Sequence, residues 1–287
     1  MKVRKAIVAV AGSGTRLLPA TKAQPKEMLP IVDKPIIQYL VEEMAEAGIE
    51  DIIMVTRWDK KPLEDHFDRS IELEQSLEKA GKTKYLQQVR KIAELANFVY
   101  VRQKGPYGNG TPILSAASLV DDEPFVFAFG DDLVKSKVSF TKQLVKAYDE
   151  FQCPIIGVQK VPKNEVDRYG IIKLKKGTRE IEDLVEKPSV ADAPSQLAQF
   201  GRMILNQEIV DILKTTATGK GGELWITDAV RTYVKNGGKV RVLEVEDGEW
   251  MTTGDPLNYL KATIEYALDR EDLNKEFKKY LKERLSK

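Results

Sequence analysis

An apolar run at Ala6–Val10, followed at once by Gly12 and Gly14, constrains the fold of this chain more than any other feature. Five apolar residues that end in a glycine turn are typical of a buried strand in an α/β sheet. Two glycines let the backbone turn sharply, and the amide groups of such a turn form a nest that binds anions. Three cations follow within a few residues: Arg16, Lys22 and Lys26. The segment therefore predicts a loop that holds a polyphosphate.

Two better-known phosphate loops are excluded by the same residues. A P-loop requires Gly-Lys-Ser/Thr, whereas this chain has Gly14-Thr15-Arg16. A dinucleotide-binding fingerprint requires a third glycine where Leu17 stands, and an acidic residue about twenty positions later at the end of a second strand. Asp33 stands near that distance, but Val32–Pro35 is typical of a turn.

Short apolar runs alternate with amphipathic segments along most of the chain. We expect strands at Ala6–Val10, Asp51–Val55, Phe98–Val101, Phe125–Phe129, Ile155–Val158 and Ile171–Leu174. We expect helices at Pro35–Ala47, Thr111–Leu119 and Thr141–Tyr148, and a charged helical excursion at about 59–95. This alternation predicts an α/β fold, a Rossmann-like and mostly parallel sheet flanked by helices, with ligands at the carboxyl ends of the strands.

Composition narrows the classes of function. The 45 basic and 44 acidic residues nearly cancel, so no overall field attracts nucleic acid or a membrane. One cysteine and one histidine, Cys153 and His66, cannot form an internal disulfide or assemble a zinc site, so we expect a hard cation held by carboxylates, namely magnesium (Mg2+). The apolar run after Met1–Lys5 is too short for a signal peptide or a membrane span. We therefore expect a soluble, cytoplasmic protein with one large α/β domain.

Two adjacent carboxylates, Asp131 and Asp132, follow the apolar strand Phe125–Phe129. Charges at the end of a buried strand cost desolvation energy unless they meet a cation. In a parallel sheet they project toward the same crevice as the glycine turn. We expect them to hold a metal ion bound to a triphosphate; the alternative is that they cap a turn.

Two further segments offer polar groups for a base and a sugar. Gln103–Thr111 is rich in glycine, which lets a flat base lie against the backbone, and Gln103 can present a donor and an acceptor to a pyrimidine edge. Glu186 can accept hydrogen bonds from sugar hydroxyls, and Lys187 can neutralise a phosphate. From the residues alone, Glu186–Pro188 is equally well explained as a charged strand end.

The stretch Ala11–Lys22, followed by Pro25–Pro35, resembles the sugar-nucleotide pyrophosphorylases, a family of nucleotidyltransferases that join a nucleoside triphosphate to a sugar 1-phosphate. Pro19–Pro35 is closest to the prokaryotic members that act on UTP and glucose 1-phosphate, and the resemblance runs from Val3 to about Ala262. It implies that UDP-glucose and pyrophosphate form by direct in-line displacement at the α-phosphorus.

The resemblance also implies roles for individual residues. It assigns catalysis to Arg16, Lys26 and Lys187. Nucleotide binding falls to Ala11, Gly12, Gly14, Thr15, Gln103, Gly108 and Asp131. Sugar binding falls to Gly170, Glu186, Lys187 and Gly201, in a pocket that Glu223 and Asp228 help to shape. Asp131 is the expected metal ligand.

Thr252 departs from the family pattern, because most relatives carry an aspartate there as the second metal carboxylate. We therefore expect Asp131, triphosphate oxygens and water to hold Mg2+, with Asp132 or Asp255 as further candidates. Residues 1–256 would form the nucleotidyltransferase domain, with a nucleotide half at about 1–135 and a sugar half at about 155–256. The helical segment 257–287 either packs on the domain edge or joins copies into a homo-oligomer, a dimer or tetramer.

Two alternatives stay open from the sequence. The enzyme could transfer a deoxythymidylyl or another nucleotidyl group to a related hexose 1-phosphate. A non-catalytic nucleotide-sugar sensor could have kept the fold, and Thr252 favours that hypothesis, whereas Arg16, Lys26, Asp131 and Lys187 oppose it.

Overall fold

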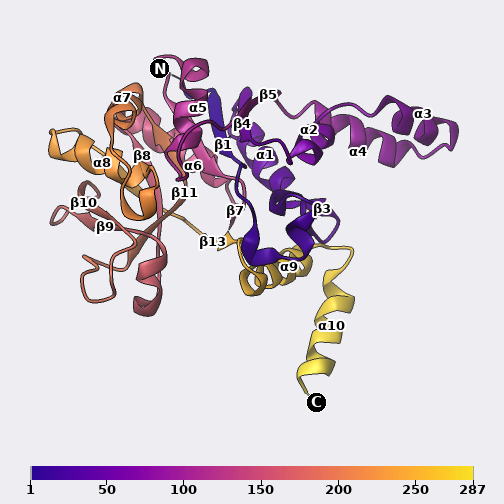
Figure 1. The fold of residues 1–287 in the computed structure, drawn as a ribbon. Helices are drawn as coiled ribbons and strands as arrows, with labels where there is room; N and C mark the ends of the chain where they lie inside the picture. The colour runs from indigo at the N-terminus through magenta and orange to yellow at the C-terminus, as the bar shows by residue number, and fades with distance from the viewer. Residues whose placement is uncertain (1, 287) are drawn as a thin grey trace.

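A nine-stranded sheet forms the centre of the computed structural model, which describes residues 2–286 apart from the side chain of Lys220 (Figure 1). Its main path has the order β10-β9-β11-β6-β1-β4-β5, and β8 pairs with β11 and with β12. The strands of this sheet are β1 (Lys5–Ala9), β4 (Asp51–Thr56), β5 (Asn97–Arg102), β6 (Phe125–Phe129), β8 (Ile155–Lys160), β9 (Gly170–Leu174), β10 (Ile181–Glu186), β11 (Leu197–Leu205) and β12 (Arg241–Glu244). Two small sheets pair β2 (Pro30–Ile31) with β3 (Lys34–Pro35) and β7 (Asp132–Ser136) with β13 (Gly248–Thr252).

The strands beside the glycine turn are parallel. Ala9, the last residue of β1, pairs with Phe129 of β6 on one side and with Val55 of β4 on the other. Their carboxyl ends therefore meet at one edge of the sheet, where ligand sites of α/β folds lie. The remaining part differs, because β11 runs antiparallel to β6, β8 and β9, and β9 runs antiparallel to β10.

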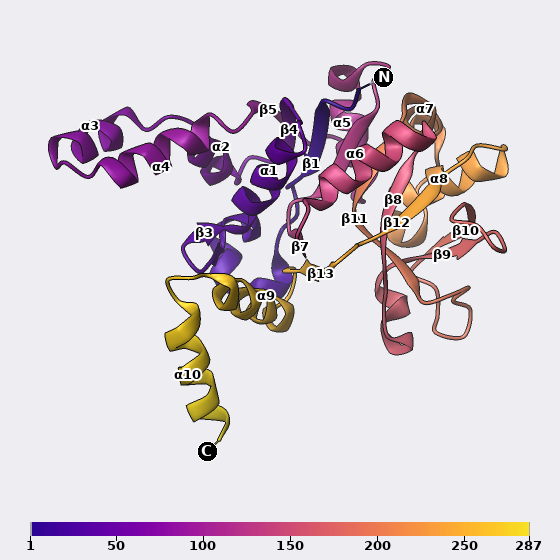
Figure 2. The same ribbon diagram turned by 180° about the vertical axis from the view of Figure 1, so that it is seen from behind.

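Helices cover both faces of the sheet. Alternate side chains of β1 point to opposite faces, so both faces carry apolar side chains that must be covered. Ala6 and Val8 join the core under α1 (Ile36–Glu46) and α6 (Phe140–Phe151), and Ile7 joins the core on the opposite face (Figure 2). That second face is covered by α5 (Thr111–Val120), α7 (Gln207–Thr215) and α8 (Ile226–Lys235). The predicted mostly parallel sheet flanked by helices is confirmed.

The predicted helices are found within a few residues of their expected bounds. The largest difference is at α6, which begins at Phe140 and continues to Phe151, whereas the apolar pattern predicts Thr141–Tyr148. Ser139 explains the early start, since its Oγ accepts a hydrogen bond from the Lys142 amide (3.2 Å) and caps the first turn.

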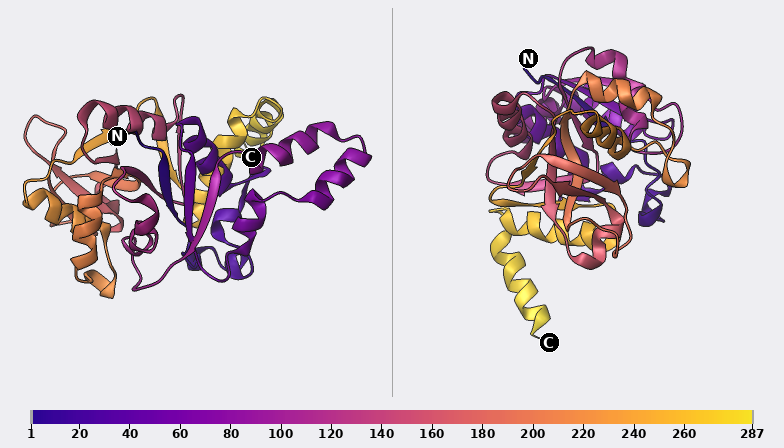
Figure 3. Two further views of the ribbon diagram at one scale, coloured as in Figure 1. Left: turned by 90° about the horizontal axis from the view of Figure 1, so that it is seen from above. Right: turned by 90° about the vertical axis from the view of Figure 1, so that its left-hand side faces the viewer.

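Two helical segments extend away from the sheet (Figures 1 and 3). The charged excursion consists of α2 (Lys61–Phe67), α3 (Ile71–Lys79) and α4 (Thr83–Ala93). The second segment is at the C-terminal end of the chain. There α9 (Pro256–Asp269) packs against β13 and β2, and α10 (Asn274–Leu285) projects beyond α9. Self-association through these last helices stays a prediction. Within the described residues, no helix has the length and apolar character needed to cross a membrane.

Candidate active site

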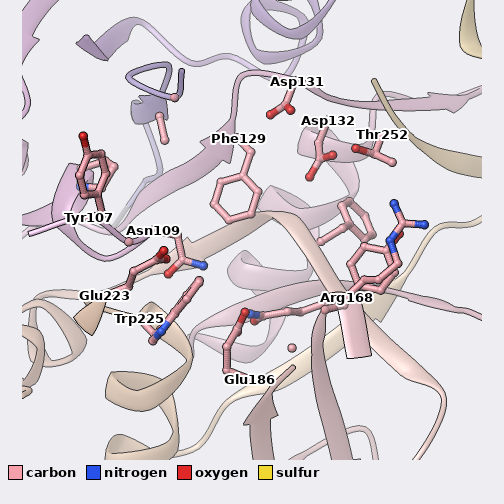
Figure 4. A pocket seen from close by; sticks show the side chains of 18 of the residues that line it. Tyr107, Asn109, Phe129, Asp131, Asp132, Arg168, Glu186, Glu223, Trp225 and Thr252 are labelled. Atoms are coloured by element: carbon pink, nitrogen blue, oxygen red, sulfur yellow. The ribbon is translucent and has the colours of Figure 1, made fainter. Parts of the chain in front are cut away.

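A cavity of about 420 Å³ opens where β1 and β6 end, and it extends across to β9, β10 and β11 (Figure 4). Its wall contains most of the residues that the sequence nominates: Ala11, Gly12, Arg16, Lys26, Gln103, Gly108, Asp131, Asp132, Gly170, Glu186 and Lys187. Other nominated residues are not part of the wall: Gly14, Thr15, Lys22, Gly201, Asp228 and Asp255. The structure thus brings both expected halves of the site to one cavity.

The turn after β1 is held in shape by its own side chains. Gly14 adopts a left-handed conformation (φ 65°), and a Cβ atom there would meet Thr21 and Lys26 at 3.1 to 3.3 Å. Thr21 Oγ1 donates a hydrogen bond to the Gly14 carbonyl (2.8 Å). Gly14 therefore supports the turn from behind, while Ala11 and Gly12 face the cavity.

Lys26 and Asp131 form an ion pair in the cavity wall, with 2.5 Å between Nζ and Oδ2. Burial opposes the charged form of both groups, but each partner outweighs it: the pKa of Lys26 is raised and the pKa of Asp131 is lowered. Arg16 joins them, since a Cβ atom at Gly254 would lie 2.9 Å from both Arg16 Nη2 and Asp131 Oδ2. Two cations and one carboxylate thus converge where a polyphosphate is expected.

A second ion pair lies beneath the first and was not expected from the sequence. Glu27 Oε2 accepts from Lys60 Nζ at 2.9 Å, and both side chains are almost fully buried. Burial raises the pKa of Glu27, against the nearby ammonium groups of Lys60 and Lys26. Glu27 also packs under Gly130, where a Cβ atom would meet Glu27 Cγ at 3.1 Å. The pair therefore ties the Lys26 segment to the turn before Asp131 and to the loop after β4.

Asp132 points inward from the start of β7. Its Oδ2 accepts from the Gly201 amide (3.0 Å), and burial, together with the Asp131 carboxylate, raises the pKa of Asp132 to about 6. Gly201 itself lies behind the wall, because the ring of Phe129 would come within 2.3 Å of a Cβ atom there. Gly201 thus touches the site through Asp132 and Phe129.

The oxygen donors of this region fit a magnesium ion. Asp131, Asp132 and the Thr252 hydroxyl share the cavity wall (Figure 4), and proteins hold Mg2+ through one or two carboxylates plus phosphate oxygens. Asp255 is engaged elsewhere, because it caps α9 by accepting from the Asn258 amide (3.1 Å) and pairs with Arg168. Within the part of the chain that the structure describes, no group of three or more His, Cys, Asp or Glu side chains could hold a metal alone.

The base side of the cavity depends on a close backbone contact. Gly108 has φ 125°, and a Cβ atom there would lie 2.2 Å from the Leu224 carbonyl oxygen. The Leu224 amide donates to the Tyr107 carbonyl (2.8 Å), and Asn109 Oδ1 accepts from the Ile226 amide (2.9 Å). The glycine-rich loop that carries Gln103 is therefore attached to the segment that leads into α8.

The sugar side of the cavity, formed around Glu186, Lys187 and Gly170, contains a partly buried hydrogen bond and a lysine held over an aromatic ring. Glu186, at the end of β10, accepts from Thr227 Oγ1 (2.5 Å), and burial raises the pKa of Glu186. Lys187 adopts a positive φ (44°) and places Nζ 4.1 Å from the ring centre of Trp225 and 3.9 Å from Glu186 Oε1. Gly170 lies on the same wall.

Several wall residues were missed by sequence reasoning. Phe200 and Trp250 stack with ring centroids 5.2 Å apart, and Trp250 also packs at 5.2 Å against Tyr169, which directly precedes Gly170. Aromatic residues in strands are typical of a core, so their pattern gave no signal. Arg168 and Gln199 were missed as well, since Arg168 ends a charged run at Lys163–Arg168 and Gln199 is a single polar residue between Ala198 and Phe200.

The chain belongs to the nucleotidyl transferase family, which it matches over residues 5–268. This confirms the family inferred from the glycine turn and Pro25–Pro35, and with it a nucleotidyltransferase enzyme.

The names of individual relatives describe a more specific activity than the family name does. The chain is 47% identical over 287 residues to UTP--glucose-1-phosphate uridylyltransferase YngB of Bacillus subtilis, covering 98% of this chain and 95% of that protein. It is 48% identical over 284 residues to UTP--glucose-1-phosphate uridylyltransferase 2 of Staphylococcus saprophyticus, covering 98% of both. A UDP-glucose pyrophosphorylase crystallised with UDP-glucose superposes with a TM-score of 0.83 at 42% identity, covering 93% of this chain and 100% of that one. A UTP-bound UGPase from Acinetobacter baumannii gives 0.88 at 36% identity, covering 97% and 98%.

Proposed function

We propose that this chain transfers a uridylyl group from UTP to glucose 1-phosphate, giving UDP-glucose and pyrophosphate. The observation that carries the proposal is that one cavity joins Arg16, Lys26 and Asp131 to Glu186 and Lys187. Cations for a triphosphate and a carboxylate–lysine pair for a sugar phosphate thus face the same space. The relatives with this activity in their names match nearly the whole chain, which supports the same substrates here.

The reaction needs no protein nucleophile, because the attacking phosphate of the sugar is already an anion. Catalysis then consists of positioning and charge neutralisation at the α-phosphorus. Arg16 and Lys26 would bind the β- and γ-phosphates and stabilise the departing pyrophosphate. Lys187 would aim the phosphate of glucose 1-phosphate for in-line attack, and Glu186 would hold hydroxyls of the hexose.

Magnesium belongs to the same proposal. Asp131 would hold the ion with triphosphate oxygens, helped by Asp132 or by the Thr252 hydroxyl. The ion would supply positive charge that neutralises the triphosphate oxygens. Lys26 would then exchange its bond to Asp131 for bonds to phosphate. Asp255 is the weaker candidate, because the helix cap and Arg168 already occupy its oxygens.

Pyrophosphate release from a panel of nucleoside triphosphates and hexose 1-phosphates tests the proposal. We expect UTP with glucose 1-phosphate to be the preferred pair, and Asp131→Asn to lower kcat/KM by about 10²- to 10³-fold, as for the loss of one group that stabilises charge. Asp65→Asn, an exposed carboxylate paired with Lys61 on α2, is the control and should leave turnover unchanged. Preference for deoxythymidine triphosphate would reject the uridylyl assignment. Nucleotide-sugar binding without any turnover would favour the sensor.

A further inference from the structure

A buried amide on β11 takes part in the sugar side of the cavity without a role in the proposed chemistry. Gln199 lines the cavity, yet only 7% of its surface is exposed. Its Nε2 donates to Thr227 Oγ1 at 2.9 Å, and Thr227 Oγ1 donates to Glu186 Oε2 at 2.5 Å. Gln199, Thr227 and Glu186 thus form one hydrogen-bonded relay.

The relay fixes which way the Gln199 amide faces. An ionised carboxylate only accepts hydrogen bonds, so the single hydroxyl proton of Thr227 points to Glu186. The Thr227 oxygen must then accept from its other neighbour, which places the NH2 group of Gln199 toward Thr227. The amide oxygen, Oε1, is buried and finds no hydrogen-bond partner among the described residues.

An unpartnered buried oxygen is costly, and native structures usually satisfy such groups. The amide packs against Gly170, and only a glycine leaves room for it there, since a Cβ atom would lie 2.6 Å from Gln199 Nε2. Gly170 and Glu186 both line the part of the cavity proposed for the hexose. A ligand hydroxyl there could accept from the second N–H of Nε2, and it could donate to Oε1 once a small turn of the amide uncovers that oxygen.

We propose that Gln199 is a specificity-determining residue that hydrogen-bonds a hydroxyl of the hexose and so helps to select which sugar 1-phosphate reacts. The inference rests on the proposed function, because it needs a nucleotide sugar in this cavity. Glu186 supplies acceptors to the sugar, whereas Gln199 supplies both an acceptor and a donor beside it. Together they distinguish hexoses by the positions of their hydroxyls.

Calorimetric titration of UDP-glucose and of UDP into the wild-type protein and Gln199→Met tests this inference. Methionine keeps the length of the side chain and removes its amide. We expect the Kd of UDP-glucose to rise about 10-fold, as for the loss of one hydrogen bond whose partner stays buried, and the Kd of UDP to stay unchanged. Gln196→Met is the matched control, because Gln196 is exposed and bonds the Val161 carbonyl. It should bind both ligands as the wild type does.

Turnover with a set of glucose 1-phosphates that each lack one hydroxyl provides the second readout. For the deoxy sugar that lacks the contacted hydroxyl, wild type and Gln199→Met should have the same kcat/KM, whereas the other sugars should keep the difference. Unchanged UDP-glucose affinity in Gln199→Met, or an equal loss for UDP, would overturn the role of Gln199 alone. Failure of the wild-type protein to bind UDP-glucose would instead overturn the proposed function.

Discussion

The two sides of the cavity are built in different ways. The phosphate side comes mainly from one stretch of sequence after β1, and its charged groups are already paired with each other: Lys26 with Asp131 and Glu27 with Lys60. The sugar side is assembled from β9, β10, β11 and the start of α8, and hydrogen bonds connect the Gln199 amide, the Thr227 hydroxyl and the Glu186 carboxylate. The phosphate side therefore contains ion-paired charged groups, and the sugar side presents oriented hydrogen-bonding groups.

This difference between the two sides suits the two proposed ligands, a nucleoside triphosphate and a hexose. A triphosphate carries several negative charges, so its site needs cations whose charge is balanced until the ligand arrives. A hexose is neutral and is recognised by the positions of its hydroxyls, so its site needs oriented donors and acceptors. The carboxylates reflect the contrast: the pKa of Asp131 is lowered by its cations in spite of burial, whereas burial raises the pKa of Glu186.

The largest expected effect is the loss of the Lys26 charge. Lys26→Met removes a phosphate contact and the ion-pair partner of Asp131, so we expect kcat/KM to fall by about 10³-fold. Lys187→Met should cost less, about 10²-fold, because Lys187 is more exposed and its carboxylate neighbour is 3.9 Å away. Steady-state pyrophosphate release measures both. The exposed Lys61→Met is the control, and equal losses at Lys26 and Lys187 would contradict the contrast between the two sides.

The next effect concerns stability. Lys60→Met should lower the free energy of unfolding by about 3 kcal/mol, because it leaves the buried Glu27 carboxylate uncompensated. The double variant Glu27→Met/Lys60→Met should recover most of that loss, since a buried ion pair can often be replaced by apolar side chains. On the sugar side, Thr227→Val should cost less, about 2 kcal/mol, because it removes the hydrogen bonds to Gln199 and to the Glu186 carboxylate. Urea unfolding curves compare all three, and a double variant no more stable than Lys60→Met would contradict a compensated pair.

The same contrast explains what the sequence could predict. The glycine turn, its cations and Asp131 were identified because they follow apolar strands closely, and parallel strands bring their carboxyl ends together. Gln199 and Trp250 could not be identified, because they join the site through antiparallel pairing and through the small β7–β13 sheet. Apolar periodicity marks a strand but not its partner or direction. Lys60 could not be predicted for a related reason. It belongs to a charged run, and nothing in the sequence distinguishes a buried lysine there from the exposed ones.

The smallest expected effect is the pH dependence that Glu186 adds on the sugar side. Glu186 accepts hydroxyl hydrogen bonds best when ionised, and its raised pKa means that protonation begins at a higher pH than for an exposed glutamate. The affinity for UDP-glucose should therefore fall as the pH is lowered from about 7 to 5, because the ligand favours the form that is being lost. UDP-glucose is the right probe, since its diphosphate stays fully ionised over this range, unlike the phosphate of glucose 1-phosphate. Glu186→Gln should bind more weakly and have a smaller slope than the wild type, whereas Glu223→Gln, on the same wall, should keep the wild-type slope. Asp132, whose pKa is raised to about 6, adds a pH dependence that all three proteins share. A wild-type slope no steeper than that of Glu186→Gln would mean that the carboxylate does not hold the hexose, and the hexose would then be held by neutral groups alone.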